Sequence, residues 1–166
     1  SARDIYEELP PFVLGLTTGH TPLGLYRELV KRYQSGEISF ANVAVYSLDE
    51  FYPIRSTEQQ SRNFRIHDEF LSQVDILPEN IHIIDGSTPV EHISEYCIKY
   101  DRMARNIDLL VIGMGEHGQI GFNEPGSYAK SITRMVQLSY QSRKAQAGLF
   151  YGVEHTPKMA ITMGIS

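Results

Sequence analysis

The sequence of 166 residues has a single cysteine, no excess of positive charge and no long apolar run. One cysteine, Cys97, excludes an intrachain disulfide and favours a reducing compartment, so we expect a cytoplasmic protein. A net charge of −5 argues against the basic surface that nucleic-acid binding requires. No apolar stretch approaches the length of a membrane span, so we expect no membrane partner.

Several short functional motifs are also missing. The sequence has neither the GK[ST] ending of a P-loop nor a GxGxxG fingerprint, so a nucleotide ligand is not indicated. It has no HExxH and no paired-cysteine spacing, so we expect no metal site. Cys97 lies at helical spacing with Ile93 and Tyr100, which favours a core position over a nucleophile.

The chain does contain a regular alternation of strand-like and helix-like segments. Apolar runs predict strands at 12–17, 43–48, 80–84, 107–115, 132–138 and 159–164. Amphipathic spacing predicts helices at 22–36, 61–74 and 89–104, with a polar helix at 142–150. Strands that are apolar throughout are typical of a buried parallel sheet. We therefore predict an α/β, Rossmann-like fold, a mostly parallel sheet with helices on both faces.

Three polar segments follow predicted strands, at 17–22, 49–53 and 115–125. Ligands of such folds bind beyond the carboxyl ends of the strands, so we expect the three segments at one edge of the sheet. In the first segment, glycine and hydroxyl groups precede a helix, where unpaired backbone N–H groups attract anions. These residues are Thr18, Gly19, His20 and Thr21. The alternative is a plain strand-to-helix turn with Thr21 as N-cap, and the residues alone favour neither.

The second segment places Asp49 and Glu50 side by side at the end of a strand. Neighbouring side chains on extended backbone point to opposite sides, so we expect separate roles for the two carboxylates. A carboxylate beside a pocket is a candidate general base. Taken in isolation, the alternative of an aspartate that closes a turn is the stronger reading.

The third segment, "GEHGQIGFNEP", is the richest in functional groups. Its glycines, with Gly113 just before it, allow tight backbone turns near a ligand. His117 is a candidate proton carrier near neutral pH, and Glu124 is a candidate to orient it or to contact the substrate. The alternative is a solvated loop, but the number of glycines and titratable groups after a buried strand favours function.

Together the segments resemble the glucosamine-6-phosphate deaminase (isomerase) family. The resemblance rests on "LGLTTGHTPLGLYRELV", "VYSLDEFYPI", "ILPENIHIIDG" and "GMGEHGQIGFNEPGS", and it extends over 12–164. "FNEP" separates the chain from the related 6-phosphogluconolactonases. The resemblance implies conversion of glucosamine 6-phosphate and water to fructose 6-phosphate and ammonia, without a cofactor. It also implies that 1–166 is one domain that lacks N- and C-terminal parts of the family's full domain.

The resemblance assigns roles by position. Residues 18–21 hold the sugar phosphate, Asp49 takes the proton from C2, and Glu124 supports the ring-opening group. Gly115 and Gln119 contact the substrate. The family's loop reads G-x-D-G-H-I-x-F-N-E-P, so His117 stands at its aspartate and Gln119 at its ring-opening histidine. An amide does not titrate near neutral pH, so Gln119 cannot act as the general acid or base that opens the ring by the family's usual route.

The resemblance also covers binding sites for phosphate beyond the active loop. The family's allosteric phosphate site corresponds to Ser127 and Arg134, with Val136 in place of a lysine. Gly148 stands, in ungapped register, where the family carries a phosphate-binding arginine.

Three functions remain open at this point: an active divergent deaminase, a sugar-phosphate-binding regulatory module without catalysis, and an isomerase or lactonase for another phosphosugar. In each case the expected partner is a small phosphorylated sugar, with a homo-oligomer or a fused domain as further partners. A deaminase could open the ring with His117 from its shifted position, or use the open-chain sugar directly.

Overall fold

The computed structural model describes residues 9–115 and 118–165, and a parallel sheet forms its centre. Four strands make this sheet in the order β4-β2-β1-β5, and all of their pairings are parallel. The strands are β1 (Phe12–Leu16), β2 (Val43–Ser47), β4 (Ile81–His82) and β5 (Leu109–Leu110). The predicted α/β class with a parallel sheet is confirmed.

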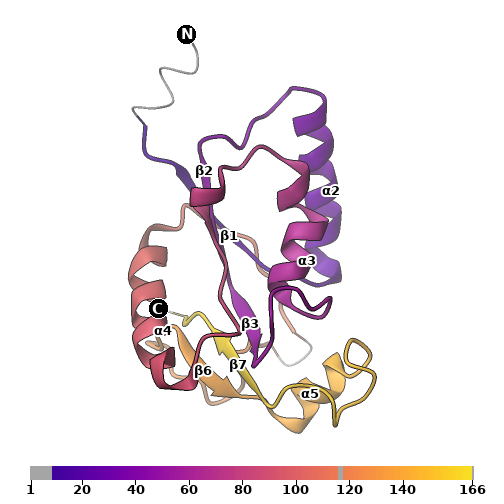
Figure 1. Cartoon of the computed structure of the whole chain (residues 1–166), viewed down its shortest axis with the longest axis vertical. Helices are drawn as coiled ribbons and strands as arrows, with labels where there is room; N and C mark the ends of the chain where they lie inside the picture. Colours follow the sequence, from indigo (N-terminus) through magenta and orange to yellow (C-terminus); the bar gives the residue numbers. More distant parts are fainter. Residues whose placement is uncertain (1–8, 116–117, 166) are drawn as a thin grey trace.

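Helices cover both faces of this sheet (Figure 1). On one face, α2 (His20–Gln34) and α3 (Arg62–Glu69) pack against apolar side chains of β1 and β2. On the other face, α4 (Ile93–Met103) packs through Cys97 and Tyr100 against Tyr46. The period of two along β2 explains the division, because Val45 and Tyr46 belong to opposite cores. The predicted core position of Cys97 is confirmed, since the residue is buried.

Short 3-10 segments interrupt two of the predicted helices. The stretch at 61–74 divides into α3 and η1 (Leu71–Gln73), and the stretch at 89–104 into η3 (Val90–His92), α4 and η4 (Ala104–Asn106). A further turn, η2 (Pro78–Asn80), leads into β4. The helix predicted at 142–150 is α5 (Tyr140–Gln146), which begins earlier because Ser139 caps it.

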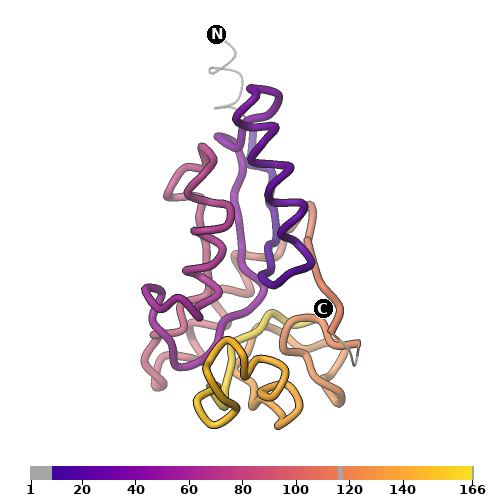
Figure 2. The backbone as a smooth tube through the Cα atoms, turned by 90° about the vertical axis from the view of Figure 1, so that its right-hand side faces the viewer, coloured from indigo at the N-terminus to yellow at the C-terminus, as the bar shows by residue number. Residues whose placement is uncertain are grey.

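A second sheet, antiparallel, lies below the carboxyl ends of the first (Figure 2). It contains β3 (Asp49–Tyr52), β7 (Met159–Thr162) and β6 (Arg134–Gln137), in the order β3-β7-β6. The expectation of a polar loop at 49–53 is therefore wrong, because this segment is a strand. The chain passes from one sheet to the other at Leu48, whose N–H donates to Leu16 O and whose carbonyl accepts from Met163 N, both at 2.9 Å.

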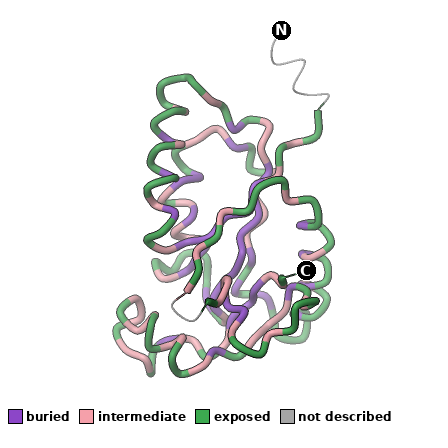
Figure 3. Tube along the Cα trace, turned by 180° about the vertical axis from the view of Figure 1, so that it is seen from behind, coloured by how far each residue is buried: buried purple, intermediate pink, exposed green. Residues whose placement is uncertain are grey.

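The stretch at 107–115 also differs from expectation. Its apolar sequence predicts a long buried strand, but only Leu109 and Leu110 are in β5, and they are 54% and 38% exposed. These side chains are exposed because β5 is an edge strand, which pairs only with β1. Figure 3 shows that buried residues gather in the middle of the molecule and exposed ones on its outside. After Leu110 the chain no longer pairs with β1 and turns towards the carboxyl ends of the other strands.

A buried carboxylate fixes the start of α3. Glu50 is 1% exposed and accepts four hydrogen bonds, from the Ser61 hydroxyl at 2.7 Å and from backbone N–H groups of its surroundings. The backbone donors are Phe51 at 2.8 Å and Arg62 and Asn63, both at 2.9 Å. Two of them are N–H groups of the first turn of α3, which have no partner within a helix. Glu50 thus joins β3 to the N-terminus of α3.

We expect Glu50→Gln to lower the free energy of unfolding by about 2–4 kcal/mol, because an amide NH₂ group would face backbone donors that a carboxylate satisfies. Urea denaturation of the full-length protein measures the change. The matched control is Glu79→Gln at an exposed position, where we expect a change within about 0.5 kcal/mol. Equal unfolding midpoints for Glu50→Gln and the wild type would contradict the capping role.

Candidate functional site

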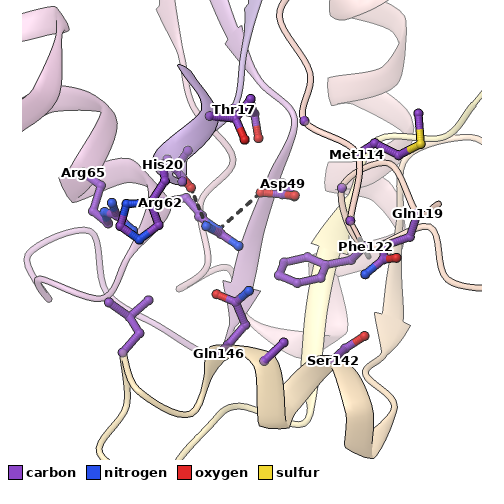
Figure 4. A pocket seen from close by; sticks show the side chains of 18 of the residues that line it. Thr17, His20, Asp49, Arg62, Arg65, Met114, Gln119, Phe122, Ser142 and Gln146 are labelled. Carbon is purple, nitrogen blue, oxygen red and sulfur yellow. Dashed lines mark hydrogen bonds and ion pairs between the residues drawn. The ribbon is translucent and has the colours of Figure 1, made fainter. Parts of the chain in front are cut away.

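A cavity of about 720 Å³ lies where the two sheets meet (Figure 4). All three polar segments line it: the first contributes Thr18, the second Asp49 and the third Gln119, among other residues. Two arginines of α3 and residues of α5 complete the wall. The expectation that the three segments lie together is confirmed. The volume lies within the range of small-molecule sites.

The first wall of the cavity is the N-terminus of α2. The helix begins at His20, and its N-cap is Gly19, which has φ 111° and makes no side-chain capping bond. The predicted capping by Thr21 is therefore wrong, because Thr21 is already the second residue of the helix. A left-handed φ at the cap suits glycine. The amide groups of this helix end, together with the Thr18 and Thr21 side chains, therefore line the cavity.

Asp49 lies on the next wall, as the first residue of β3. Its carboxylate is buried, at 4% exposure, and one oxygen is 3.5 Å from Nε of Arg62. Burial raises the pKa of Asp49, while the positive charge of Arg62 opposes the shift. A carboxylate in this setting is a stronger base than one in water. Glu50 points away from the cavity towards α3, as the alternation of side chains along a strand predicts. Burial also raises the pKa of Glu50, while the hydrogen bonds that its carboxylate accepts lower it.

The glycine-rich segment passes directly against Asp49. Gly121 has φ 57°, and a Cβ atom there would lie 3.1 Å from Asp49 Oδ2 and 3.0 Å from Thr162 Oγ1. The segment is held by β7, because Phe122 N donates to Thr162 Oγ1 at 3.2 Å and Asn123 Nδ2 donates to Met163 O at 2.8 Å. Only glycine fits position 121 without strain or displacement of the carboxylate.

Gln119 lies over the backbone of Gly115, and both residues line the cavity. A Cβ atom on Gly115 would fall 2.3 Å from the terminal side-chain carbon of Gln119, so a side chain at position 115 would displace the end of Gln119. Gly115 N also donates to Gln119 O at 2.9 Å. His117, the predicted proton carrier, lies outside the described residues.

Glu124 is not brought to this cavity. Its two carboxylate oxygens accept from Ser139 N at 3.2 and 3.1 Å, and it lines a second hollow of about 360 Å³. Ser127 and Arg134 line the same hollow and are bonded to each other, Arg134 Nη2 to Ser127 Oγ at 3.2 Å. Arg134 also donates to Asn123 Oδ1 at 3.0 Å. The roles of these three residues remain predictions.

Arg62 is a residue of the site that sequence reasoning missed. Its Nη1 donates to Thr18 Oγ1, and its guanidinium lies 4.9 Å from the ring centre of Phe51 and 5.4 Å from that of Phe122. It therefore connects the first segment to Asp49. The available signal was the i, i+3 pair of Arg62 and Arg65 at the start of a helix that follows a candidate base.

Metal and membrane features were searched over the described chain. Within 9–115 and 118–165, His, Cys, Asp and Glu side chains form no group of three that could hold a metal ion. None of the helices that the structure describes has the length and apolar character needed to cross a membrane. Within the described part of the chain, the ionisable side chains that line the main cavity are those of Asp49, Arg62, Arg65 and His20.

Comparison with known proteins gives consistent matches. The model of the family described as glucosamine-6-phosphate isomerases/6-phosphogluconolactonase matches residues 1–145. The chain is 39% identical over 162 residues to a glucosamine-6-phosphate deaminase of Thermoanaerobacter sp. (strain X514), covering 96% of this chain and 63% of the relative. It is 41% identical over 157 residues to glucosamine-6-phosphate deaminase 2 of Bacillus subtilis (strain 168), covering 92% and 62%. The chain thus spans less than two thirds of the length of these relatives.

Solved structures show the same fold. A monomeric glucosamine-6-phosphate deaminase, 37% identical, matches with a TM-score of 0.88 over 99% of this chain and 70% of its own. A 6-phosphogluconolactonase from Thermotoga maritima, 22% identical, matches with a TM-score of 0.69 over 98% and 67%. The second likeness concerns the fold alone.

We expect Arg62→Met to raise the pKa of Asp49 further, because the substitution removes the positive charge that opposes the effect of burial. The carboxyl carbon shift of Asp49, followed by NMR against pH, measures this. Arg65→Met removes the same charge from the same helix without a contact to Asp49, and we expect a clearly smaller shift. An unchanged or lowered pKa in Arg62→Met would refute the electrostatic coupling.

Proposed function

The chain belongs to the glucosamine-6-phosphate isomerase/6-phosphogluconolactonase family, and from that premise we propose that the full-length protein is a glucosamine-6-phosphate deaminase. It converts glucosamine 6-phosphate and water to fructose 6-phosphate and ammonia. The observation that carries the proposal is the shared cavity, where a buried Asp49 lies next to the α2 N-terminus and below the glycine-rich segment. The named activities of the relatives support the same reaction.

Asp49 is the base of the proposed reaction. It removes the proton from C2 of the open-chain aminosugar and returns it at C1, which moves the double bond before water releases ammonia from C2. The neighbouring C1 aldehyde acidifies the C2 proton, so a carboxylate is basic enough. Burial helps, because it raises the pKa of Asp49. The phosphate binds at Thr18–Thr21, and Gly115 and Gln119 contact the sugar.

Ring opening is the step for which the cavity gives least support. Gln119 cannot exchange a proton near neutral pH, and Glu124 is engaged with Ser139 N. In the proposed function the ring opens with His117 as proton carrier, or the protein takes the open-chain sugar directly. Both routes leave the isomerisation to Asp49.

A second candidate is a sugar-phosphate-binding regulatory module. Gln119 at the expected ring-opening position favours it, because binding needs no titratable group there. A third, an isomerase or lactonase for another phosphosugar, keeps the cavity but does not explain the "FNEP" motif.

We also propose a cytoplasmic location and a homo-oligomer or a fused domain as partner. An effector phosphate at Ser127 and Arg134 would compete with the bond between those two side chains.

We expect the full-length protein to release ammonia and fructose 6-phosphate from glucosamine 6-phosphate, and Asp49→Asn to lower kcat by about 10²–10⁴-fold because the amide cannot accept the C2 proton. Coupled assays of both products measure turnover. Asp68→Asn, at an exposed aspartate of α3, is the control and keeps wild-type activity. Wild-type turnover no higher than that of Asp49→Asn would refute the deaminase. A panel of other phosphosugars then tests the third candidate.

We expect the double variant Gln119→His with His117→Asp to raise kcat, because it restores a titratable group at the ring-opening position. Calorimetry with glucosamine 6-phosphate measures substrate binding by the wild type and the double variant, for comparison with their turnover. Tight binding without turnover in the wild type identifies the regulatory module. A double variant that binds the sugar but shows no gain in kcat would show that residues 117 and 119 do not limit the reaction.

A further inference from the structure

Two arginines of α3 line the main cavity, and both are near the end of α2 that also lines it. Arg62 and Arg65 are three residues apart, which places them on one face of α3. In Figure 4 both lie on the same side of the cavity as His20, the first residue of α2. Among the described residues that line the cavity, they are the only lysines or arginines. Two cations and a helix N-terminus thus border one space.

Arg62 has hydrogen-bonding capacity that the described protein groups do not use. The residue is 7% exposed, and its Nε is buried without a hydrogen-bond partner in the described structure. The nearest acceptor, Asp49 Oδ1, is 3.5 Å away, which is an ion pair but not a hydrogen bond. Buried polar atoms are normally satisfied, so a guanidinium with an unpaired Nε in the wall of a cavity favours an acceptor bound beside it. An anionic acceptor suits this position, because the guanidinium carries a full positive charge.

Arg65 is held in place by a partner on its own helix. Its Nε and Nη2 donate to one oxygen of Glu69 at 3.1 and 2.7 Å. The side chain is partly exposed, at 22%, so it reaches the cavity from a fixed position. A guanidinium held at one edge can still donate from its other edge, and a phosphate accepts such fork-shaped donation well.

We propose that Arg62 and Arg65 form the cationic wall of a phosphate subsite that faces the N-terminus of α2, and that Arg62 joins this subsite to Asp49. The proposal rests on the proposed function, because it names where the phosphate of the sugar lies. The helix end supplies backbone N–H donors, and the arginines supply charge. Both arginines are already paired with carboxylates, and a helix end carries only about half a positive charge, so a phosphate dianion draws on both groups.

The position of Arg62 between the two groups has a kinetic consequence. Arg62 donates to Thr18 and is paired with Asp49. A phosphate bound beside Thr18 competes with Asp49 for the same guanidinium. Weakening of the ion pair leaves Asp49 a stronger base, so a phosphorylated sugar activates its own base. Unphosphorylated glucosamine then has a lower kcat as well as a higher KM.

Calorimetry and steady-state kinetics on the full-length protein test the subsite. The probes are glucosamine 6-phosphate, inorganic phosphate and glucosamine. We expect Arg65→Met to weaken binding of the two phosphate probes by about 10–100-fold, as for loss of one charged hydrogen bond, with KM raised and kcat nearly unchanged. Arg62→Met weakens the same probes and removes the difference in kcat between glucosamine 6-phosphate and glucosamine, because Asp49 then has no ion pair for the phosphate to weaken. Arg65→Lys restores part of the binding, because it keeps the charge.

The matched control is Arg27→Met, which removes one positive charge from an exposed position of α2 outside the cavity and leaves phosphate binding unchanged. Folded Arg65→Met protein that binds inorganic phosphate as tightly as the wild type overturns the subsite, even when the wild type deaminates the sugar. Weakened phosphate binding without any deamination by the wild type keeps the subsite and overturns the proposed function. Where Arg62→Met does not fold, Arg65→Met decides alone.

Discussion

The bond between the Glu50 carboxylate and the start of α3 is the contact on which the site depends. Asp49 and Glu50 are neighbours on β3, so their side chains point to opposite sides of the strand. Glu50 binds the N–H groups of Arg62 and Asn63 and so fixes α3 relative to β3. The same helix then returns Arg62 to Asp49 and to Thr18. Two consecutive carboxylates thereby position a helix and place a buried carboxylate in the wall of the cavity.

The electrostatics of the cavity follow from this arrangement. Burial raises the pKa of Asp49 and the Arg62 guanidinium lowers it, so two effects of opposite sign act on this carboxylate. The glycine-rich segment closes over the carboxylate at Gly121, where any side chain would crowd Asp49. Anything that binds next to Arg62 therefore changes the balance at Asp49. On this ground we propose that binding at the α2 N-terminus changes the basicity of Asp49.

Local patterns predicted much of this fold, and distant contacts account for what they missed. The strand at 12–17 and the helix after it follow from short apolar and 3.6-residue periods, and β1 and α2 confirm them. The strand β3 was missed because it begins with two acidic residues and pairs with Thr162, more than a hundred positions away. Asp49 was found from its place after an apolar run. Arg62 was missed because an arginine on a helix usually lies in water, and only the fold shows that it is buried.

The most direct test of the account is a crystal structure of the full-length Asp49→Asn protein with glucosamine 6-phosphate bound. The account predicts that C2 of the sugar lies about 3 Å from the side chain at position 49, within reach for proton transfer. It also predicts the phosphate between the α2 N-terminus and the pair Arg62 and Arg65. A sugar whose C2 faces away from position 49, or whose phosphate lies in the hollow beside Arg134, would contradict it.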